Sequence, residues 1–301
     1  MLSTIADRIH PMVPGIDVRI LRSQEDPALG YYLIDVPHSV SAPHCVRHQS
    51  PETHWSCYPL RHGSATIYLS EAQVAARYRD RFELARRQVD RLARLHAGAA
   101  VAQPTKMTLA IGVVPAISGH RPLTGDGPVI RTYFDAVWKE GGSRISPRFG
   151  TFQVARGRLR STSSALDVEL HTDGSAWASM SIGRVSPENI HVLDMDEFER
   201  TAVELTAMVG GYTAWAGSAG DCAVGAWLDP GSRQLGIRGN PTNLSVRPIA
   251  AETTAPVGAL GGDRIQVGQV VYPLVRDLEQ DMGIEEPDLL QPGGSFGRPT
   301  T

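Results

Sequence analysis

Residues 30–81 decide the fold of the N-terminal part of this chain. The segments that matter are Gly30-Tyr31-Tyr32-Leu33-Ile34-Asp35-Val36-Pro37, Ala42-Pro43-His44, Arg61-His62-Gly63-Ser64-Ala65-Thr66 and Ser70-Glu71-Ala72-Gln73. The first segment has strand alternation, with one face more strongly apolar than the other. Pro37 cannot donate to a β-ladder and ends that strand. With a strand over 18–22, the segment predicts a hairpin, followed by a Pro-rich loop that Pro43 keeps extended.

A long helix follows this region. Ser70 and Gln73 form a capping box, in which each side chain satisfies a backbone N–H of the first helical turn. From Glu71 to about His96, apolar residues recur at spacings of three and four, which predicts a helix with an apolar stripe. The stripe residues are Val74, Tyr78, Phe82, Ala85, Val89 and Leu92.

Length and composition indicate an ordinary globular protein. The chain has 301 residues, of which 42% are hydrophobic and 20% charged, which suggests about two domains. No apolar run approaches the ~18 residues of a membrane span, and no signal peptide is recognisable, so we expect a cytoplasmic protein without a membrane partner. Three cysteines, an odd number, argue against a disulfide framework.

The pattern of elements predicts an α+β fold in two parts. Residues 1–98 form the first part and end in the arginine-rich helix, and residues 105–284 form a second α+β domain of unknown role, with the boundary near 97–106. The expected strands and helices of the second part are mixed without a βαβ rhythm. Residues 285–301 are acidic and then rich in Pro and Gly, and predict a disordered tail.

The order of motifs over residues 1–85 resembles the later half of the Schlafen-type AlbA-like domain, whose bacterial members are described as DNA-binding or divergent AAA-type ATP-binding proteins. The resemblance rests on the strand ending at Pro37, the loop with Ser39, Pro43 and His44, and the turn with Gly63 and Thr66. It implies a partial AlbA-like module that binds nucleic acid. The earlier half of the family domain, with its Glu-Phe-Lys-type strand, would precede Met1.

The same resemblance argues against catalysis by this chain, although the family has nuclease members. Their cleavage chemistry resembles metal-dependent attack by clustered carboxylates, which the family carries on its early strands. Asp35, Glu52 and Glu71 match no catalytic position and are not spaced to share an ion. We therefore expect no catalytic residues, no metal and no cofactor, and no nuclease activity.

Candidate nucleic-acid contacts are basic residues of the first part, with Tyr31, Trp55 and Tyr58 as stacking faces. The basic residues are Arg47, Arg61, His62, Arg77 and Arg81, together with the other arginines of the helix between residues 77 and 94. The charge balance argues for local binding only. Residues 1–98 hold 12 arginines against 10 acids, and the whole chain has a net charge of −3. The alternative is a solvated helix face in a structural or protein-interaction subunit, with self-association as one outcome.

Three other sites remain as alternatives. Cys45, His48, His54 and Cys57 are ligand types that suit Zn²⁺, but their spacing is shorter than that of a zinc finger, and a solvated loop is the competing interpretation. ATP binding rests on the family label alone, because neither a P-loop nor a Gly-x-Gly-x-x-Gly motif is present. His171 and Asp173 suggest acid–base chemistry, but a hairpin turn explains them better.

Overall fold

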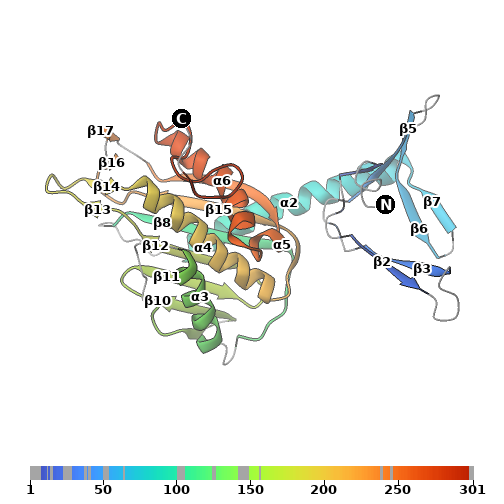
Figure 1. Cartoon of the computed structure of the whole chain (residues 1–301), viewed down its shortest axis with the longest axis horizontal. Helices are drawn as coiled ribbons and strands as arrows, with labels where there is room; N and C mark the ends of the chain where they lie inside the picture. Colours follow the sequence, from blue (N-terminus) through green and yellow to red (C-terminus); the bar gives the residue numbers. More distant parts are fainter. Residues whose placement is uncertain are drawn as a thin grey trace. The chain divides into compact units, whose positions relative to one another are not determined.

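The computed structural model describes residues 8–11, 13, 16–22, 29–36, 39, 42–49, 54–63, 65–99, 106–123, 127–141, 149–155, 157–237, 240–244 and 247–297 (Figure 1). The chain forms two compact units, Met1–Arg86 (unit 1) and Arg87–Thr301 (unit 2). The division lies inside the long helix, after Arg86, whereas the sequence predicted a boundary beyond the helix, near residues 97–106. The second half of the helix belongs to unit 2 because it packs on the sheet of that unit.

Unit 1 consists of short antiparallel strands and the first half of helix α2. Its elements are β1 (Ile9–His10), β2 (Asp17–Arg22), β3 (Gly30–Asp35), β4 (Cys45–Gln49), β5 (His54–Cys57), β6 (Pro59–His62), β7 (Ala65–Tyr68) and α2 (Glu71–Ala99). Among the described residues, β1, β4 and β5 form one sheet, while β2–β3 and β6–β7 are separate two-stranded sheets.

The predicted hairpin is confirmed as β2–β3, with Val18 paired to Ile34. The second hairpin, β6–β7, turns at Gly63, whose φ of 59° lies in the region that glycine adopts without steric cost. One expectation was wrong, because the supposed loop at residues 45–57 contains the hairpin β4–β5.

Helix α2 begins as predicted. Ser70 N donates to Gln73 Oε1 at 2.9 Å, and Gln73 N donates to Ser70 Oγ at 3.4 Å. The predicted apolar stripe is not a buried face along its whole length, because Phe82 is 66% and Val89 38% exposed, whereas Leu92 is fully buried. Helical periodicity therefore identified the helix correctly but did not tell which part of it is covered.

Unit 2 is a mixed α+β domain, which confirms the predicted fold class. Its strands are β8 (Thr108–Ile117), β9 (Gln153–Ala155), β10 (Arg158–Thr162), β11 (Leu166–His171), β12 (Ala176–Ser181), β13 (Arg184–Val185), β14 (His191–Leu193), β15 (Ala219–Asp229), β16 (Leu235–Ile237), β17 (Asn240–Leu244) and β18 (Ile249–Pro256). Its further helices are α3 (Gly127–Gly141), α4 (Met195–Trp215), α5 (Val257–Leu260) and α6 (Arg264–Asp281). None of the described helices combines the length and apolar character needed to cross a bilayer.

The main sheet of unit 2 is antiparallel, with strand order β18-β15-β8-β12-β11-β10-β9 (Figure 1). Helices α3, α4 and α6 cover one face, where the large core contains Val113, Phe134 and Phe198. The central strand β8 is apolar on both faces, as expected for a strand that is covered on both sides. A smaller sheet has the order β13-β14-β16-β17.

The second half of α2 covers the other face of the main sheet. Leu92 packs against Val114 and Ala223. His96 stacks on Trp227, with ring centroids 4.1 Å apart, and its Nδ1 accepts a 3.2 Å hydrogen bond from Trp177 Nε1. Burial lowers the pKa of His96, which favours the neutral ring that this hydrogen bond requires.

The C-terminal tail differs from the prediction. Of the supposed disordered segment 285–301, residues 285–297 are described and folded onto unit 2, with Leu289 and Leu290 buried. The buried carboxylate of Glu199, on α4, accepts hydrogen bonds from the backbone N–H groups of Asp288, Leu289 and Leu290. The composition of this segment suggested disorder, but the hydrogen bonds to the distant Glu199 side chain hold residues 288–290 in place.

A candidate anion-binding cavity

A polar cavity of about 240 Å³ lies in unit 2, on the face of the sheet that α2 covers. Helix α2 contributes Arg91, Arg94, Leu95 and Gly98, and the strands and the turn below contribute Arg158, Glu169, His171 and Ser175. The cavity therefore brings three guanidinium groups together from two elements.

Local sequence explains why these side chains share a face. Strand β11 reads Leu-Asp-Val-Glu-Leu-His, so Leu166, Val168 and Leu170 enter the apolar core while Glu169 and His171 face α2. Arg91 and Arg94 are three residues apart on α2 and are therefore neighbours on one side of the helix.

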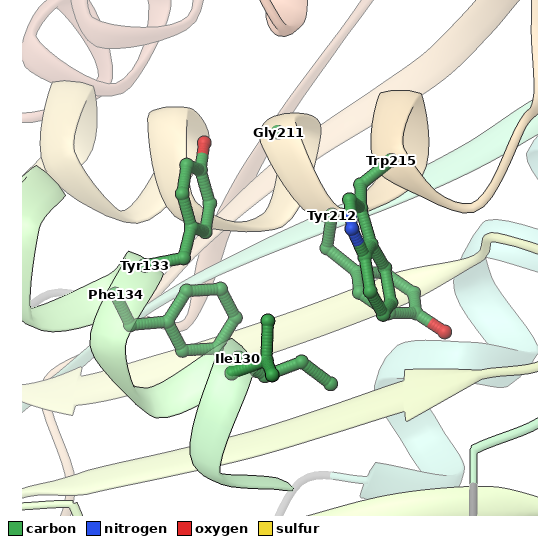
Figure 2. Close-up of a pocket in the computed structure, with 7 residues that line it drawn as sticks. Ile130, Tyr133, Phe134, Gly211, Tyr212 and Trp215 are labelled. Atoms are coloured by element: carbon green, nitrogen blue, oxygen red, sulfur yellow. The ribbon is translucent and has the colours of Figure 1, made fainter. Parts of the chain in front are cut away.

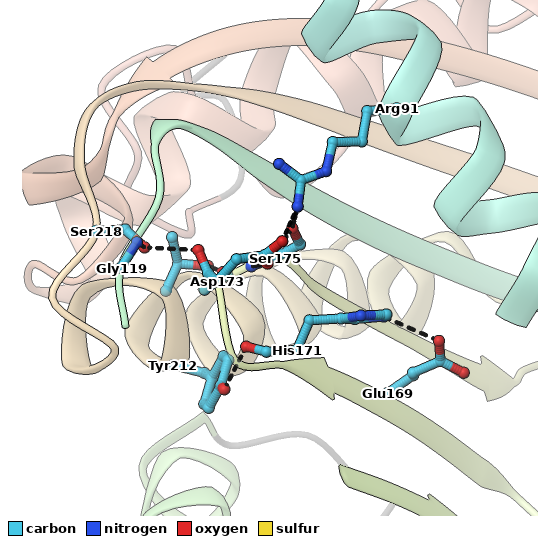
Figure 3. Close-up of polar contacts among 10 residues, drawn as sticks. Arg91, Gly119, Glu169, His171, Asp173, Ser175, Tyr212 and Ser218 are labelled. Atoms are coloured by element: carbon cyan, nitrogen blue, oxygen red, sulfur yellow. Dashed lines mark hydrogen bonds and ion pairs between the residues drawn. The ribbon is translucent and has the colours of Figure 1, made fainter. Parts of the chain in front are cut away.

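The turn between β11 and β12 holds the floor of the cavity in a fixed conformation. The predicted hairpin turn is confirmed, since Gly174 N donates to the His171 carbonyl at 3.0 Å. The Tyr212 hydroxyl, on α4, donates to the same carbonyl at 2.7 Å, and Gly119 N donates to the Asp173 carbonyl at 3.0 Å (Figure 3). A side chain at Gly174, where φ is +83°, would collide with Ser218.

Arg91 reaches from α2 to this turn (Figure 3). Its guanidinium pairs with the Asp173 carboxylate and donates to Ser175 Oγ at 3.0 Å. Asp173 Oδ1 accepts from Ser175 N at 2.8 Å and from Ser175 Oγ at 2.6 Å. Asp173 is thus a turn residue and also the group that positions Arg91.

Glu169 organises the other side of the cavity. Its Oε1 accepts from Arg158 at 2.7 Å and from His171 Nε2 at 2.9 Å, and the side chain is only 2% exposed. Burial raises the pKa of Glu169, but the hydrogen bonds and charges of His171 and Arg158 outweigh it and leave the pKa below its usual value. The carboxylate is therefore ionised at neutral pH.

Arg94 is the cation of the cavity that lacks a partner. It is exposed, and it makes no hydrogen bond or ion pair with any residue that the structure describes. Burial lowers the pKa of Arg91, and the positive charge of Arg94 lowers it further, because the two guanidinium groups repel each other.

The C-terminus of α2 has a partial negative charge, and Arg160 lies beside it. Arg160 donates to the Ala99 carbonyl at 3.5 Å.

The predicted nucleic-acid contacts lie elsewhere, in unit 1. Arg47 is exposed on β4, Arg61 and His62 on β6, and Arg77 and Arg81 belong to the first half of α2. Arg61 donates to Thr66 Oγ1 at 3.1 Å across the β6–β7 hairpin. The five residues therefore come from three different elements, β4, β6 and α2.

The predicted stacking residues and motif residues differ in exposure. Tyr31 is 77% exposed, whereas Tyr58 packs edge-on against Tyr78 with hydroxyls 3.2 Å apart. In the motif loop, Pro43 is buried and His44 Nδ1 lies 2.6 Å from the Pro11 carbonyl. Ser39 accepts from Ala42 N through its carbonyl, and Pro37 lies outside the described residues.

The four positions of the zinc alternative lie on β4 and β5. Val46 pairs with Cys57, and His48 with Trp55, so β4 and β5 are neighbouring strands. Each strand carries one cysteine and one histidine of the proposed ligand set. Burial raises the pKa of Cys57, and the neighbouring Cys45 raises it further. The side chains of His48 and His54 lie outside the described residues, and among the described ones no cluster of three metal-binding side chains occurs. The zinc alternative therefore stays a prediction.

A second, apolar pocket of about 250 Å³ lies between α3 and α4 (Figure 2). Its walls are aromatic, formed by Tyr133 and Phe134 on α3 and by Tyr212 and Trp215 on α4. Gly211 leaves room for the Tyr133 hydroxyl, because a Cβ at this position would overlap it. The guanidinium of Arg121 lies 3.2 Å from the ring centroid of Trp215, one of the lining residues.

Arg91 and Arg94 belong to the helix whose arginines were predicted to contact phosphates, but their place in a cavity was not predicted. Arg158 and Glu169 were not singled out, and a turn was the preferred interpretation of His171 and Asp173. The alternation in β11 was the available signal, because it sets Glu169 and His171 on one face. It did not indicate that α2 lies over that face, since Arg91 and Asp173 are 82 residues apart.

Comparison of the chain with protein-family models, curated proteins and solved structures finds no match. The function must therefore be argued from the side chains described above.

Proposed function

We propose that this protein binds nucleic acid through phosphate contacts made by helix α2 and the arginine-lined cavity of unit 2. The observation that carries the proposal is the convergence of Arg91, Arg94 and Arg158 on one cavity in which Arg94 has no acidic partner among the described residues. Phosphate oxygens are the common acceptors for such guanidinium groups. The resemblance to AlbA-like modules supports the same class of ligand.

Helix α2 supports the proposal along its length. It carries seven arginines against four acids. Exposed aromatic rings of unit 1, such as Tyr31 and Tyr68, provide surfaces on which bases can stack. Because the excess charge is small, we expect moderate affinity with a small number of phosphate contacts.

Binding should be salt-dependent. If three phosphates of a single strand are neutralised, affinity should fall about 20-fold between about 50 mM and about 200 mM salt, because bound counterions are released. Fluorescence anisotropy with labelled single-stranded DNA, duplex DNA and RNA measures this directly. Absence of binding at the lower salt concentration for all three ligands would refute the proposal.

A double substitution tests the role of the cavity in this binding. Arg91→Gln with Arg94→Gln should lower both the affinity and its salt dependence. The matched control is Arg184→Gln, which removes one positive charge from an exposed position on β13 outside the cavity. A loss of binding free energy in the double variant that is only twice the loss in the control would show that the effect is one of overall charge and not of the cavity.

A second candidate function, protein association through unit 1, is favoured by a specific observation. The β2–β3 hairpin and the residue after it expose seven large apolar side chains, each between 46% and 77% exposed: Ile20, Leu21, Tyr31, Tyr32, Leu33, Ile34 and Val36. Its two strands also form a separate sheet, so both edges lack a strand partner among the described residues.

A second copy of the chain fits this surface. If β2 pairs antiparallel with its own copy about an axis between residues 19 and 20, Asp17 stands opposite Arg22, and Val18 opposite Leu21. We expect sedimentation to show a concentration-dependent dimer that Ile20→Arg converts to a monomer. A wild-type monomer at all concentrations would refute self-association.

A further inference from the structure

We propose that the cavity of unit 2 is a subsite for one phosphomonoester group, so that the protein recognises a terminal phosphate rather than only the phosphodiesters of a strand. This inference rests on the proposed function for its nucleic-acid source, but the cavity itself is a new site. The same chemistry is offered by a free phosphorylated small molecule, and the experiment below separates the two sources.

The first argument is geometric. Arginines that follow a strand of phosphodiesters are spaced along a groove, one to each phosphate. Here Arg91, Arg94 and Arg158 meet around a single cavity of about 240 Å³. Ser175 Oγ holds the Arg91 guanidinium in place by accepting from it, and donates its own hydroxyl hydrogen to Asp173. A compact group with several terminal oxygens suits converging donors of this kind.

The second argument concerns charge. A phosphomonoester carries close to two negative charges at neutral pH, whereas a phosphodiester carries one. Three guanidinium groups face two carboxylates, and these carboxylates are already engaged by Arg91 and Arg158. Arg94 supplies the uncompensated positive charge, and an anion between Arg94 and Arg91 would relieve their mutual repulsion.

Glu169 determines where in the cavity the anion can lie. Its Oε2 is buried and has no hydrogen-bond partner among the described residues, so this side of the cavity repels an anion. The favourable position is therefore at the α2 side, between Arg91 and Arg94. Asp173 does not occupy that position, because its carboxylate is bound to Arg91 and to the turn.

The experiment compares four probes by anisotropy and calorimetry with the full chain. They are a 5′-phosphorylated oligonucleotide, the 5′-hydroxyl oligonucleotide of the same sequence, a nucleoside monophosphate and inorganic phosphate. The proposal predicts about tenfold tighter binding of the phosphorylated oligonucleotide than of its hydroxyl counterpart. Arg94→Gln should remove this difference while Arg184→Gln keeps it. Arg94 is exposed and makes no ion pair with a described residue, so its replacement leaves the fold intact.

Each outcome decides something. Tighter binding of the phosphorylated oligonucleotide, lost in Arg94→Gln, supports the subsite on a nucleic-acid end. Binding of the mononucleotide and of inorganic phosphate but of neither oligonucleotide, weakened by Arg94→Gln, supports the subsite but overturns the proposed nucleic-acid function. Equal, salt-dependent binding of both oligonucleotides overturns the subsite and leaves the proposed function standing. No binding of any probe overturns both.

Discussion

Replacing Glu279 by Gln should stabilise the protein by about 2 kcal/mol near neutral pH, as measured by denaturant unfolding. Glu279 lies on α6 and is completely buried, and neither carboxylate oxygen has a hydrogen-bond partner among the described residues. Burial raises its pKa to about 9, and the neighbouring charge of Glu199 contributes to the increase. The native protein therefore has to keep this carboxyl group protonated at a pH where the unfolded chain ionises it.

The pH dependence follows from this shift. Because the folded pKa lies above the unfolded value, Glu279 costs no stability below about pH 4.5, and its cost grows as the pH rises towards about 9. The free energies of unfolding of wild type and Glu279→Gln should therefore differ little at about pH 4.5 and most above neutrality.

A matched control separates this effect from a general change of charge. Glu285→Gln removes an acid at an exposed position a few residues away and should change the stability by less than about 0.5 kcal/mol. If Glu279→Gln were as stable as wild type at all pH values, the carboxyl group would have to be hydrated or hydrogen-bonded in solution.

Replacing Leu92 by Ala should destabilise unit 2 by about 3 kcal/mol. Leu92 is completely buried between α2 and the sheet, where its side chain approaches the paired glycines Gly112 and Gly225 and lies in a cluster with Val114 and Ala223. The glycines leave a shallow space on the sheet that Leu92 and Trp227 fill. Truncation leaves a cavity that these backbone segments cannot close. Unfolding followed by tryptophan fluorescence reports the loss, because Trp227 packs in the same cluster.

Val89→Ala is the matched control on the same helix. Val89 is one turn earlier and 38% exposed, so its truncation should cost less than about 1 kcal/mol. Equal losses at the two positions would contradict the docking of α2 by its Leu92 face. A larger loss of stability at Leu92 than at Val89 would also bear on binding. Leu92 lies between Arg91 and Arg94 in the sequence, and its burial holds this part of α2 on the sheet.

Local sequence signals determined several elements. The β2–β3 hairpin, the capping box at Ser70 and the turn at Asp173-Gly174 were predicted because each depends on residues within one or two turns of chain. The α+β class followed from the mixture of such signals. Where composition replaced a local signal, as in the tail after Glu285, the prediction failed.

The candidate site was decided by tertiary structure. Nothing in the sequence near Arg91 indicates that its partners are Asp173 and Ser175, more than 80 residues away. That contact depends on which face of the sheet α2 covers and on the strand order that brings β10 and β11 beside it. In the same way, the C-terminal segment is ordered because Glu199, 89 to 91 residues earlier, accepts its backbone N–H groups.

The physical reason is the range of the forces involved. Backbone propensity, capping and turn chemistry act between neighbours in sequence, and a reader of the sequence can recognise them. Burial and charge pairing act between neighbours in space, and they are fixed only when the two faces of the sheet have been covered. The sequence by itself therefore determined the arginine-rich helix, and the tertiary structure determined that two of its arginines, Arg91 and Arg94, meet Arg158 over the β11–β12 turn.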